Sequence, residues 1–475
     1  MVTPSNSAPK PHRHNQSKRG AVKHIYKKSK KKPKQGGRLG TVVAIAVLLS
    51  SAGLIVTFAW ISIQLILNPY QVSWFNKLVP EWAQISLNNT ERSQTFKQIQ
   101  ASLDKQGLVA GKILPLEGNS AASFLLPIFK ERSHCQTNCQ SIVELRVYQR
   151  SQDLELQPTL EKYYHLANQL PIIGPEESFV VSPFVNETDD NQGSSLSLPL
   201  DEVGRFEGET PSPGFWFYLQ GHRQQGINII TYGYIVHYNP KRSHLQLMIP
   251  WTSPNGHFPQ WRQVTGSREQ ELTIDRTIGL EPQLKIYQIK PVKSVLNPMG
   301  LEAIALTPPA LKNLSYQDAL LLARSGLWTP AYQRLRSFKK QHKGIFSAAA
   351  QAQMDVIHLH SQLTATQADT SWASPSQQVV VYIIDGRWEK ALQVFEASPQ
   401  NAQEIASQLK ADGGRLWNRV EAELQVNPKR QSALAWGGLI IAAKNGKQRA
   451  SAWLREQPEI TEDSIAQIQK LLGQL

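Results

Sequence analysis

Hydrophobic residues follow three different patterns along this chain of 475 residues, and each pattern predicts a different kind of structure. Residues 41–67 form one uncharged apolar run, residues 110–295 hold short β-like runs separated by turn residues, and residues 311–475 place apolar residues at helical spacing. We therefore expect an α+β multidomain protein. Its parts would be a single N-terminal transmembrane helix, a β-rich sandwich or barrel-like domain, and a C-terminal α-helical, solenoid-like domain.

The apolar run over residues 41–67 contains no charged residue. A helix needs ~20 apolar residues to cross a bilayer core of ~30 Å, whereas the apolar region of a cleavable signal peptide has only ~7–15 residues. The run therefore predicts a membrane-spanning signal anchor. The alternative is a buried pair of helices inside a water-soluble fold.

Charge around the run predicts its orientation. Residues 1–40 contain twelve Lys and Arg and no acidic residue, while residues 68–90 contain only Lys77. By the positive-inside rule, the chain would cross the membrane once, with its N-terminus in the cytoplasm and its later domains on the extracytoplasmic side. As a whole it resembles a single-pass bacterial membrane protein.

The formal net charge of +14 belongs mainly to that tail, because 14 − 12 leaves only +2 for the remaining residues. The tail of residues 1–40 is poor in aliphatic residues and is expected to be disordered. Its lysines suit a topology signal and also anionic lipid. No specific nucleic-acid partner is expected, because nothing in the tail reads bases.

The pattern after the run divides into further segments. Residues 68–109 are expected to connect the membrane to the β-rich domain, with a helix over 91–107 that ends at Gly107. Residues 296–310 contain several prolines and predict a linker. Within the β-rich domain we expect strands in the runs 214–221, 227–238, 244–249, 271–278 and 283–289, a helix near 157–170, and an exposed loop over 185–212.

A repeat with an offset of sixty residues lies in the helical region. Gly326, Trp328 and Ala331 match Gly386, Trp388 and Ala391, and a third copy places Gly446 sixty residues further on, with Ser451 where Ala is expected. The glycine suits a tight turn between helices, the alanine suits their close approach, and the tryptophan suits the outer groove between helix pairs. The alternative is an irregular helical bundle.

The segment from Gly386 to Leu392 reads GRWEKAL and resembles the G-x-[YW]-x-x-A-L pattern of tetratricopeptide repeats. The resemblance implies stacked helix pairs whose concave surface binds other proteins. The offset of sixty residues departs from the ~34 of that family. We therefore expect a related helical solenoid with an extra helix in each unit.

The only two cysteines are Cys135 and Cys139. On the outer side of a membrane such a pair predicts a disulfide, which would stabilise the fold by roughly 2 kcal/mol. Free thiols and a metal or redox role are the alternatives, although only His134 lies near enough in sequence to assist as a ligand. No metal site and no cofactor are predicted.

No catalytic residue can be assigned from motifs, and the histidines are expected to lie scattered on the surface. One aromatic loop contains Trp251, Phe258 and Trp261, which could stack on sugar rings or anchor a partner. The favoured alternative is that these rings cap the hydrophobic core.

These observations favour a membrane-anchored, non-enzymatic interaction, scaffold or assembly factor on the extracytoplasmic side. Its protein partners would bind the helical domain. The alternatives are a hydrolase of envelope polysaccharide, with its site in the β-rich domain, and a carbohydrate-binding module that uses the aromatic loop.

Overall fold

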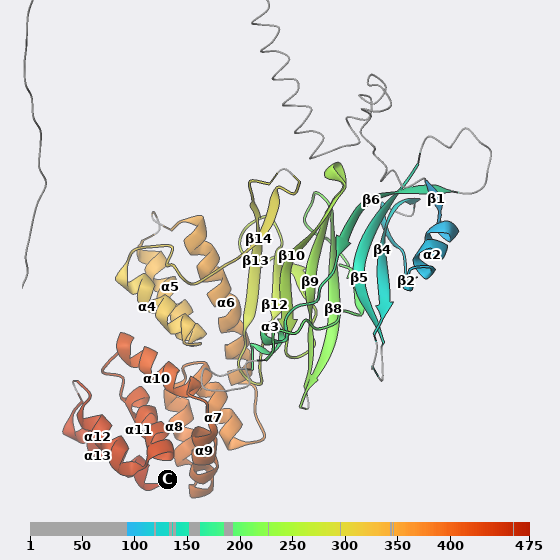
Figure 1. Cartoon of the computed structure of the whole chain (residues 1–475). Helices are drawn as coiled ribbons and strands as arrows, with labels where there is room; N and C mark the ends of the chain where they lie inside the picture. The colour runs from blue at the N-terminus through green and yellow to red at the C-terminus, as the bar shows by residue number, and fades with distance from the viewer. Residues whose placement is uncertain are drawn as a thin grey trace, which may run out of the picture. The chain divides into compact units, whose positions relative to one another are not determined.

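The computed structural model describes residues 93–475, apart from 118–119, 133–134, 136–138, 152–161, 185–192 and the single positions 227, 295, 343, 345 and 459. The described residues belong to one compact unit, in which the β-sheets come first and the helical part follows (Figure 1). The predicted tail, the run 41–67 and the first part of the connector lie outside the described residues.

No helix in the described part of the chain combines the length and the apolar character that crossing a membrane requires. This finding corrects the predicted transmembrane helix, and with it the signal anchor, the single-pass topology and the extracytoplasmic location. The longest described helix, α6 (Ala348–Asp369, 22 residues), mixes alanine with Gln, His and Asp. Residues 41–67, on which the prediction was based, are not described.

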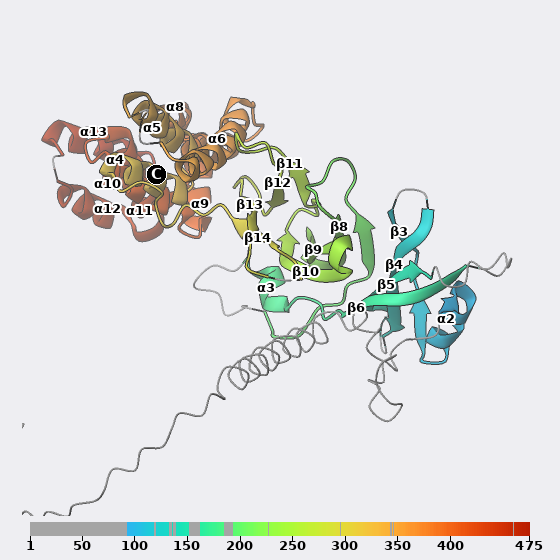
Figure 2. The same cartoon turned by 90° about the horizontal axis from the view of Figure 1, so that it is seen from above.

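The first sheet is antiparallel and follows the order β1-β6-β5-β4-β2, with β3 paired to β4. The helix α2 (Phe96–Asp104) begins with a capping box between Thr95 and Gln98 and buries Ile99 and Leu103. These side chains pack on the sheet with Phe124 and Tyr148, where Figure 2 shows α2 beside β4 and β5. The helix expected over 91–107 is thus confirmed only for residues 96–104, because residues 94–95 form β1 and the chain turns after Asp104. The strands are β1 (Gln94–Thr95), β2 (Leu108–Ala110), β3 (Leu114–Glu117), β4 (Ser120–Glu131), β5 (Gln140–Arg150) and β6 (Tyr163–Pro171).

The helix expected near 157–170 is wrong from residue 163 onwards, and its residues 157–161 lie outside the described part of the chain. Residues 163–171 form β6, which pairs with β5 on one side and with β1 on the other. The spacing of Tyr163, Tyr164, Ala167 and Leu170 fits one face of a helix. Tertiary pairing overrides that local pattern, because β5 pairs with β6 over residues 164–171 and β1 pairs with Tyr163 and Tyr164 on the other edge.

The second and third sheets are also antiparallel, with the orders β10-β9-β8-β7 and β11-β12-β13-β14. They share a core around Trp216, Ile235 and Leu272. A second core joins the first and second sheets around Leu125, Val147 and Phe217. The strands are β7 (Glu202–Arg205), β8 (Phe215–Gln225), β9 (Asn228–Asn239), β10 (His244–Ser253), β11 (Gln260–Arg262), β12 (Glu271–Asp275), β13 (Leu284–Pro291) and β14 (Met299–Ala303).

Three of these strands lie where no strand was expected. The short strand β11 contains Trp261, which was predicted to lie in the aromatic loop. The strand β7 lies in the predicted exposed loop, and β14 lies in the predicted linker 296–310 and pairs with β13. The rest of that linker is fastened to α6 by Gln353, which is 5% exposed. Its Nε2 donates to the carbonyl oxygens of Ala305 (2.7 Å) and Pro308 (3.0 Å), and its Oε1 accepts from the Ala310 N–H (3.0 Å).

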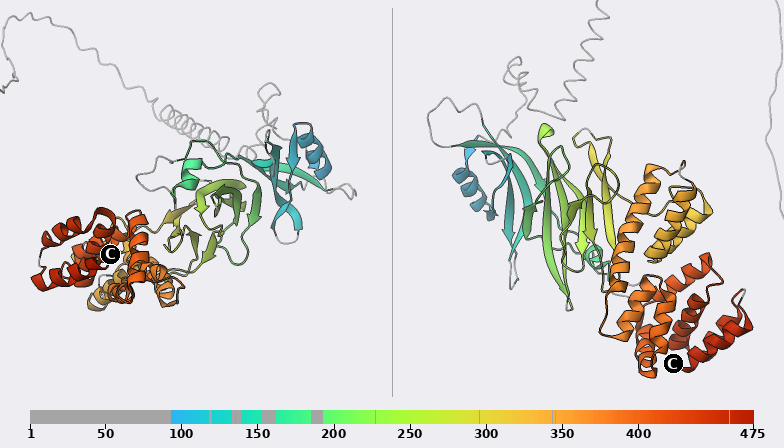
Figure 3. Two further views of the ribbon diagram at one scale, coloured as in Figure 1. Left: turned by 90° about the horizontal axis from the view of Figure 1, so that it is seen from below. Right: turned by 180° about the vertical axis from the view of Figure 1, so that it is seen from behind.

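Ten helices follow in the described chain and share one hydrophobic core. Figure 3 draws them as the yellow, orange and red coiled ribbons. The helix α6 runs alongside β13 and β14 in both Figure 1 and Figure 3. The other helices are α4 (Leu314–Arg324), α5 (Trp328–Gln341), α7 (Pro375–Ile384), α8 (Trp388–Glu396), α9 (Pro399–Ala411), α10 (Arg415–Val426), α11 (Gln431–Asn445), α12 (Lys447–Arg455) and α13 (Glu462–Gly473).

The first two glycines of the sixty-residue pattern lie in turns with the same hydrogen bonds. Gly326 (φ +88°) follows α4, and Gly386 (φ +77°) follows α7. The N–H groups of Leu327 and Arg387 donate to carbonyl oxygens five residues earlier, at 2.9 and 2.8 Å. These bonds satisfy the last carbonyl groups of each helix. The matching alanines, Ala331 and Ala391, are fully buried.

The third copy differs from the other two. Gly446 (φ +90°) is the only residue between α11 and α12, whereas three residues separate the helices at Gly326 and at Gly386, so α12 begins one residue sooner after its glycine. The buried alanine of the third copy is consequently Ala450, and the predicted match at Ser451 is displaced by one position. The tryptophans also differ: Trp388 is fully buried, whereas Trp328 is half-buried and stacks on the ring of His360. The likeness to tetratricopeptide repeats stays a prediction.

Candidate functional site

The three aromatic residues of the predicted binding loop do not come together on the surface. Trp251 is 1% exposed and belongs to the core between the second and third sheets. Trp261 is half-buried, with its ring 4.8 Å from that of Trp216. Only Phe258 is exposed, at 45%. Two of the three rings therefore belong to the core, as the alternative interpretation expected.

Cys135 and Cys139 form a disulfide between β4 and β5. The N–H of Arg132 donates to the carbonyl of Cys139 at 2.7 Å, which continues the pairing of the two strands up to the bond. A cavity of about 470 Å³ adjoins Cys139 and includes Asp201 and His222. No group of three or more His, Cys, Asp or Glu side chains is arranged for a metal ion in the described ranges.

The histidines divide into buried and exposed groups. His237 was expected on the surface but is fully buried, between Trp216 and the polar groups of Pro213 and Asn297. Burial lowers the pKa of His237 to about 4, so its imidazole is neutral at pH 7. His257 is exposed and lies 2.7 Å from the Asp275 carboxylate. Neither residue lines the three cavities described here.

The largest of these cavities, about 810 Å³, lies between the third sheet and the N-terminal part of α6. It includes Glu271, which is 1% exposed. The Glu271 carboxylate accepts hydrogen bonds from the N–H groups of Val264 and Thr265 and from the hydroxyl groups of Thr265 and Ser267. It holds the loop between β11 and β12, so its buried carboxylate is already in use.

A third cavity, of about 350 Å³, has the most distinctive chemistry. Four arginines line it, with a single acidic residue, Glu281, which gives a formal charge of 4 − 1 = +3. We call it the arginine cleft. Its walls come from the turn between β12 and β13, from the segment that follows the short helix α3 (Glu177–Val181), from the turn between α4 and α5, and from the start of α10. The arginines are Arg276, Arg324, Arg415 and Arg419.

Local structure places Glu281 in the cleft. Ile278 and Glu281 exchange backbone hydrogen bonds of 3.0 and 3.3 Å across a tight turn that contains Gly279 at φ +54°. This geometry is that of a two-residue hairpin, which requires a residue at ease with positive φ. The turn carries the Glu281 carboxylate to the guanidinium of Arg419.

Arg419 is the buried arginine of the cleft, with 3% of its surface exposed. Its Nη1 donates to Glu281 Oε1 at 2.9 Å, and its Nη2 donates to Glu281 Oε2. A Cβ atom on Gly326 would lie only 2.6 Å from Arg419 Nη2. The glycine therefore provides both the positive φ of the turn and the space for this guanidinium.

Two of the other arginines have neutral hydrogen-bond partners. Arg276 Nη2 donates to Ser182 Oγ at 3.1 Å, and Arg324 Nη1 donates to Thr307 Oγ1 at 3.0 Å. Burial lowers the pKa of Arg276, and burial followed by the charge of Arg276 lowers the pKa of Lys285. Positive charge is thus concentrated against low-dielectric walls, an arrangement that focuses the field on an approaching anion. Guanidinium groups also match the geometry of a carboxylate.

Helix α6 fixes the sheet side of the cleft. His360 Nε2 accepts a hydrogen bond of 2.8 Å from the Leu284 N–H, and His360 Nδ1 lies 2.8 Å from the Val356 carbonyl. The two contacts require a neutral ring with its proton on Nδ1. Burial lowers the pKa of His360 to about 4. The strand that follows the Glu281 turn is therefore held directly by the helical part.

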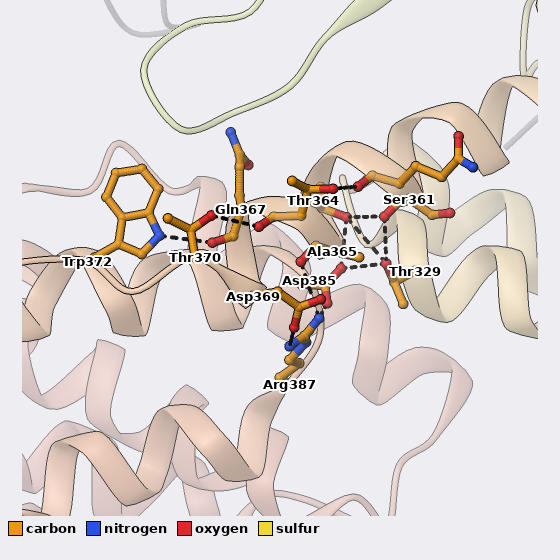
Figure 4. A network of polar contacts seen from close by, with 12 residues as sticks. Thr329, Ser361, Thr364, Ala365, Gln367, Asp369, Thr370, Trp372, Asp385 and Arg387 are labelled. Atoms are coloured by element: carbon orange, nitrogen blue, oxygen red, sulfur yellow. Dashed lines mark hydrogen bonds and ion pairs between the residues drawn. The ribbon is translucent and has the colours of Figure 1, made fainter.

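A second polar network fixes the helical side (Figure 4). The Asp385 side chain is 1% exposed and accepts from Thr329 Oγ1 (2.5 Å), Thr364 Oγ1 (2.9 Å) and Arg387 Nε (2.7 Å). Arg387 also pairs with the exposed Asp369 at 2.5 Å. The network ties the start of α5 to α6 and to the turn before α8. The groups of this network bond to one another, so we assign the network a structural role.

Sequence reasoning missed the arginine cleft. Its residues lie far apart in the chain, and only Arg415 and Arg419 share a helical spacing. Comparison with protein-family models, with curated proteins and with solved structures found no match to this chain.

Proposed function

We propose that this chain is a non-enzymatic interaction protein and that an acidic segment of a partner protein binds in the arginine cleft. The observation that carries the proposal is the convergence of four arginines on one cavity with a single carboxylate. Buried arginines at an interface bind carboxylates in a bidentate manner and contribute more than exposed charges do.

The size of the cleft favours a peptide segment over a nucleic acid. A volume of about 350 Å³ accommodates one or two side chains, whereas nucleic-acid binding uses an extended basic surface that follows many phosphates. Residues 41–475 carry a net charge of only +2, so such a surface is not expected from composition. A binding role is also consistent with the neighbouring helical array, since such arrays commonly bind proteins.

The test must separate the cleft from the basic tail, because the twelve charges of residues 1–40 also attract acidic peptides. Thermal unfolding of the full chain achieves this. A ligand raises Tm only when it binds the folded state better than the unfolded state. A segment that binds the probe equally well in the folded and in the unfolded state leaves Tm unchanged. Pentaglutamate is the probe, added up to millimolar concentration.

We expect pentaglutamate to raise the Tm of the wild-type chain and to lose that effect in the triple variant Arg276→Gln/Arg324→Gln/Arg415→Gln. Arg419 is left intact because of its burial. The matched control is Arg242→Gln/Arg449→Gln/Arg455→Gln, which removes three exposed arginines outside the cleft. A wild-type chain without any rise in Tm would refute the proposal, as would equal losses in the two triple variants.

A further inference from the structure

The buried arginine of the cleft already holds a carboxylate. Both Nη atoms of Arg419 donate to Glu281, one to each carboxylate oxygen. This is the two-bond geometry by which arginine recognises an acidic ligand. Glu281 comes from a distant part of the chain, 138 residues away. The protein thus places one of its own side chains where a ligand carboxylate would bind.

The two partners are held in place very differently. The Arg419 side chain is 4% exposed and lies on a 12-residue helix beneath Gly326. The Glu281 side chain is 24% exposed and lies in a turn closed by two backbone hydrogen bonds. A carboxylate at the tip of a hairpin can return to water at modest cost, whereas a buried guanidinium left unpaired is costly.

From this asymmetry we infer that Glu281 is an internal occupant of the cleft, and that a Glu or Asp carboxylate of the partner replaces it on Arg419. This competition rests on the proposed function, and through it Glu281 regulates the binding of acidic segments in the cleft. Exchange keeps Arg419 paired throughout, so the buried charge is compensated before and after binding. Glu281 then sets a threshold: weakly acidic segments do not displace it, and strongly acidic ones do.

The test must separate two effects of removing Glu281. Its loss makes the cleft more positive, which attracts an acidic ligand whether or not that ligand takes the place of Glu281 on Arg419. A double-mutant cycle makes the distinction. Glu281→Gln, Arg419→Gln and the double variant are compared with the wild-type chain. The apparent Kd of pentaglutamate is taken from the dependence of unfolding free energy on its concentration. Thermal unfolding without ligand verifies that each variant folds.

We expect Glu281→Gln to tighten pentaglutamate binding at least tenfold in the wild-type background and less than twofold in the Arg419→Gln background. A tenfold gain in both backgrounds would show a field effect alone and would overturn the inference. So would an unchanged or weaker affinity in Glu281→Gln. In these cases the wild-type rise in Tm and its loss in the cleft triple variant remain, so the proposed function stands.

Hydrogen exchange gives a second readout that a purely electrostatic role would not change. Saturating pentaglutamate should speed amide exchange over residues 277–283, because the hydrogen bonds between Ile278 and Glu281 open when the turn leaves Arg419. Exchange over residues 415–420 should stay unchanged or slow down. Protection of the turn by the ligand would contradict the displacement.

Discussion

The side chains of Glu281 and Arg419 form an ion pair across the junction of sheet and helices, and the arginine is the more buried of the two, at 4% against 24% exposure. Removing either partner therefore has unequal consequences. Arg419 left alone is a buried, uncompensated charge, whereas Glu281 left alone is solvated.

Glu281→Ala should accordingly lower the free energy of unfolding by about 3 kcal/mol or more, and Arg419→Met by about 1–2 kcal/mol. Urea unfolding at pH 7.5 measures both values. Glu209→Ala, which removes an exposed glutamate, serves as the control and should change stability by less than about 0.5 kcal/mol. A larger loss in Arg419→Met than in Glu281→Ala would contradict this account of the pair.

Arg387 allows a buried and an exposed carboxylate to be compared on one guanidinium. Asp385→Ala should cost about 3–5 kcal/mol, because Asp385 is 1% exposed and also accepts from two threonines. Asp369→Ala should cost much less than Asp385→Ala, because Asp369 is 69% exposed and solvent screens its pairing with Arg387. The hydrogen bond and charge of Arg387 lower the pKa of Asp369. Chemical denaturation gives both values, and similar losses would show that burial does not control this network.

Alanine substitutions at Gly326 and Gly386 of the sixty-residue pattern, and at Gly414 outside it, separate the cost of a positive φ from the cost of a steric clash. Gly414 (φ +99°) has open space around it, so Gly414→Ala should cost only about 1–2 kcal/mol of backbone strain. In Gly326→Ala and Gly386→Ala the new methyl group also meets Arg419 Nη2 at 2.6 Å and Pro330 Cγ at 2.5 Å. Overpacking adds roughly 1–3 kcal/mol. Thermal unfolding of the three variants should therefore rank Gly414→Ala as the mildest.

Stability should fall as the pH is lowered from about 6.5 towards 4. His237 and His360 have a pKa of about 4 in the folded protein against an ordinary value of 6.5. The unfolded chain therefore takes up protons first, and the stabilisation by the neutral rings, present above pH 6.5, is lost as the pH approaches 4. The loss is on the order of 3 kcal/mol for each ring.

Urea unfolding between pH 7.5 and 4.5 measures this slope. His237→Gln/His360→Gln should be less stable at pH 7.5 and should lose less stability on acidification. His358→Gln keeps both buried imidazole rings and should retain the wild-type slope. A steep slope that persists in the double variant would assign the acid sensitivity to other groups.

The sequence predicted those elements whose pattern is complete within one segment. The strands at 215–225, 228–239 and 244–253 combine β-branched or aromatic residues with clear turn residues, and α2 has its cap and its apolar face within ten residues. The pattern of Tyr163, Tyr164, Ala167 and Leu170 fits a helix locally, yet these residues form a strand because neighbours on both sides pair with it.

The candidate site could not be found in this way. Arg276, Arg324 and Arg419 lie on three elements that only the tertiary fold brings together. Gly326 illustrates the limit. Its positive φ follows from a helix-turn pattern that is legible in the sequence, whereas the space it leaves for Arg419 depends on a helix almost a hundred residues later.

The amide of Gln353 determines how the protein can be divided. Its four bonds reach Ala305, Pro308, Ala310 and the Tyr316 hydroxyl, so a cut near residue 310 removes several of its partners at once. In a fragment that begins at residue 311, the buried Gln353 amide would lose its hydrogen-bond partners at Ala305, Pro308 and Ala310, which is costly. The fragment would also lack β14. Limited proteolysis should therefore spare this stretch despite its prolines. Fragments cut to separate the sheets from the helices will therefore not reproduce the stability that either part has in the full chain.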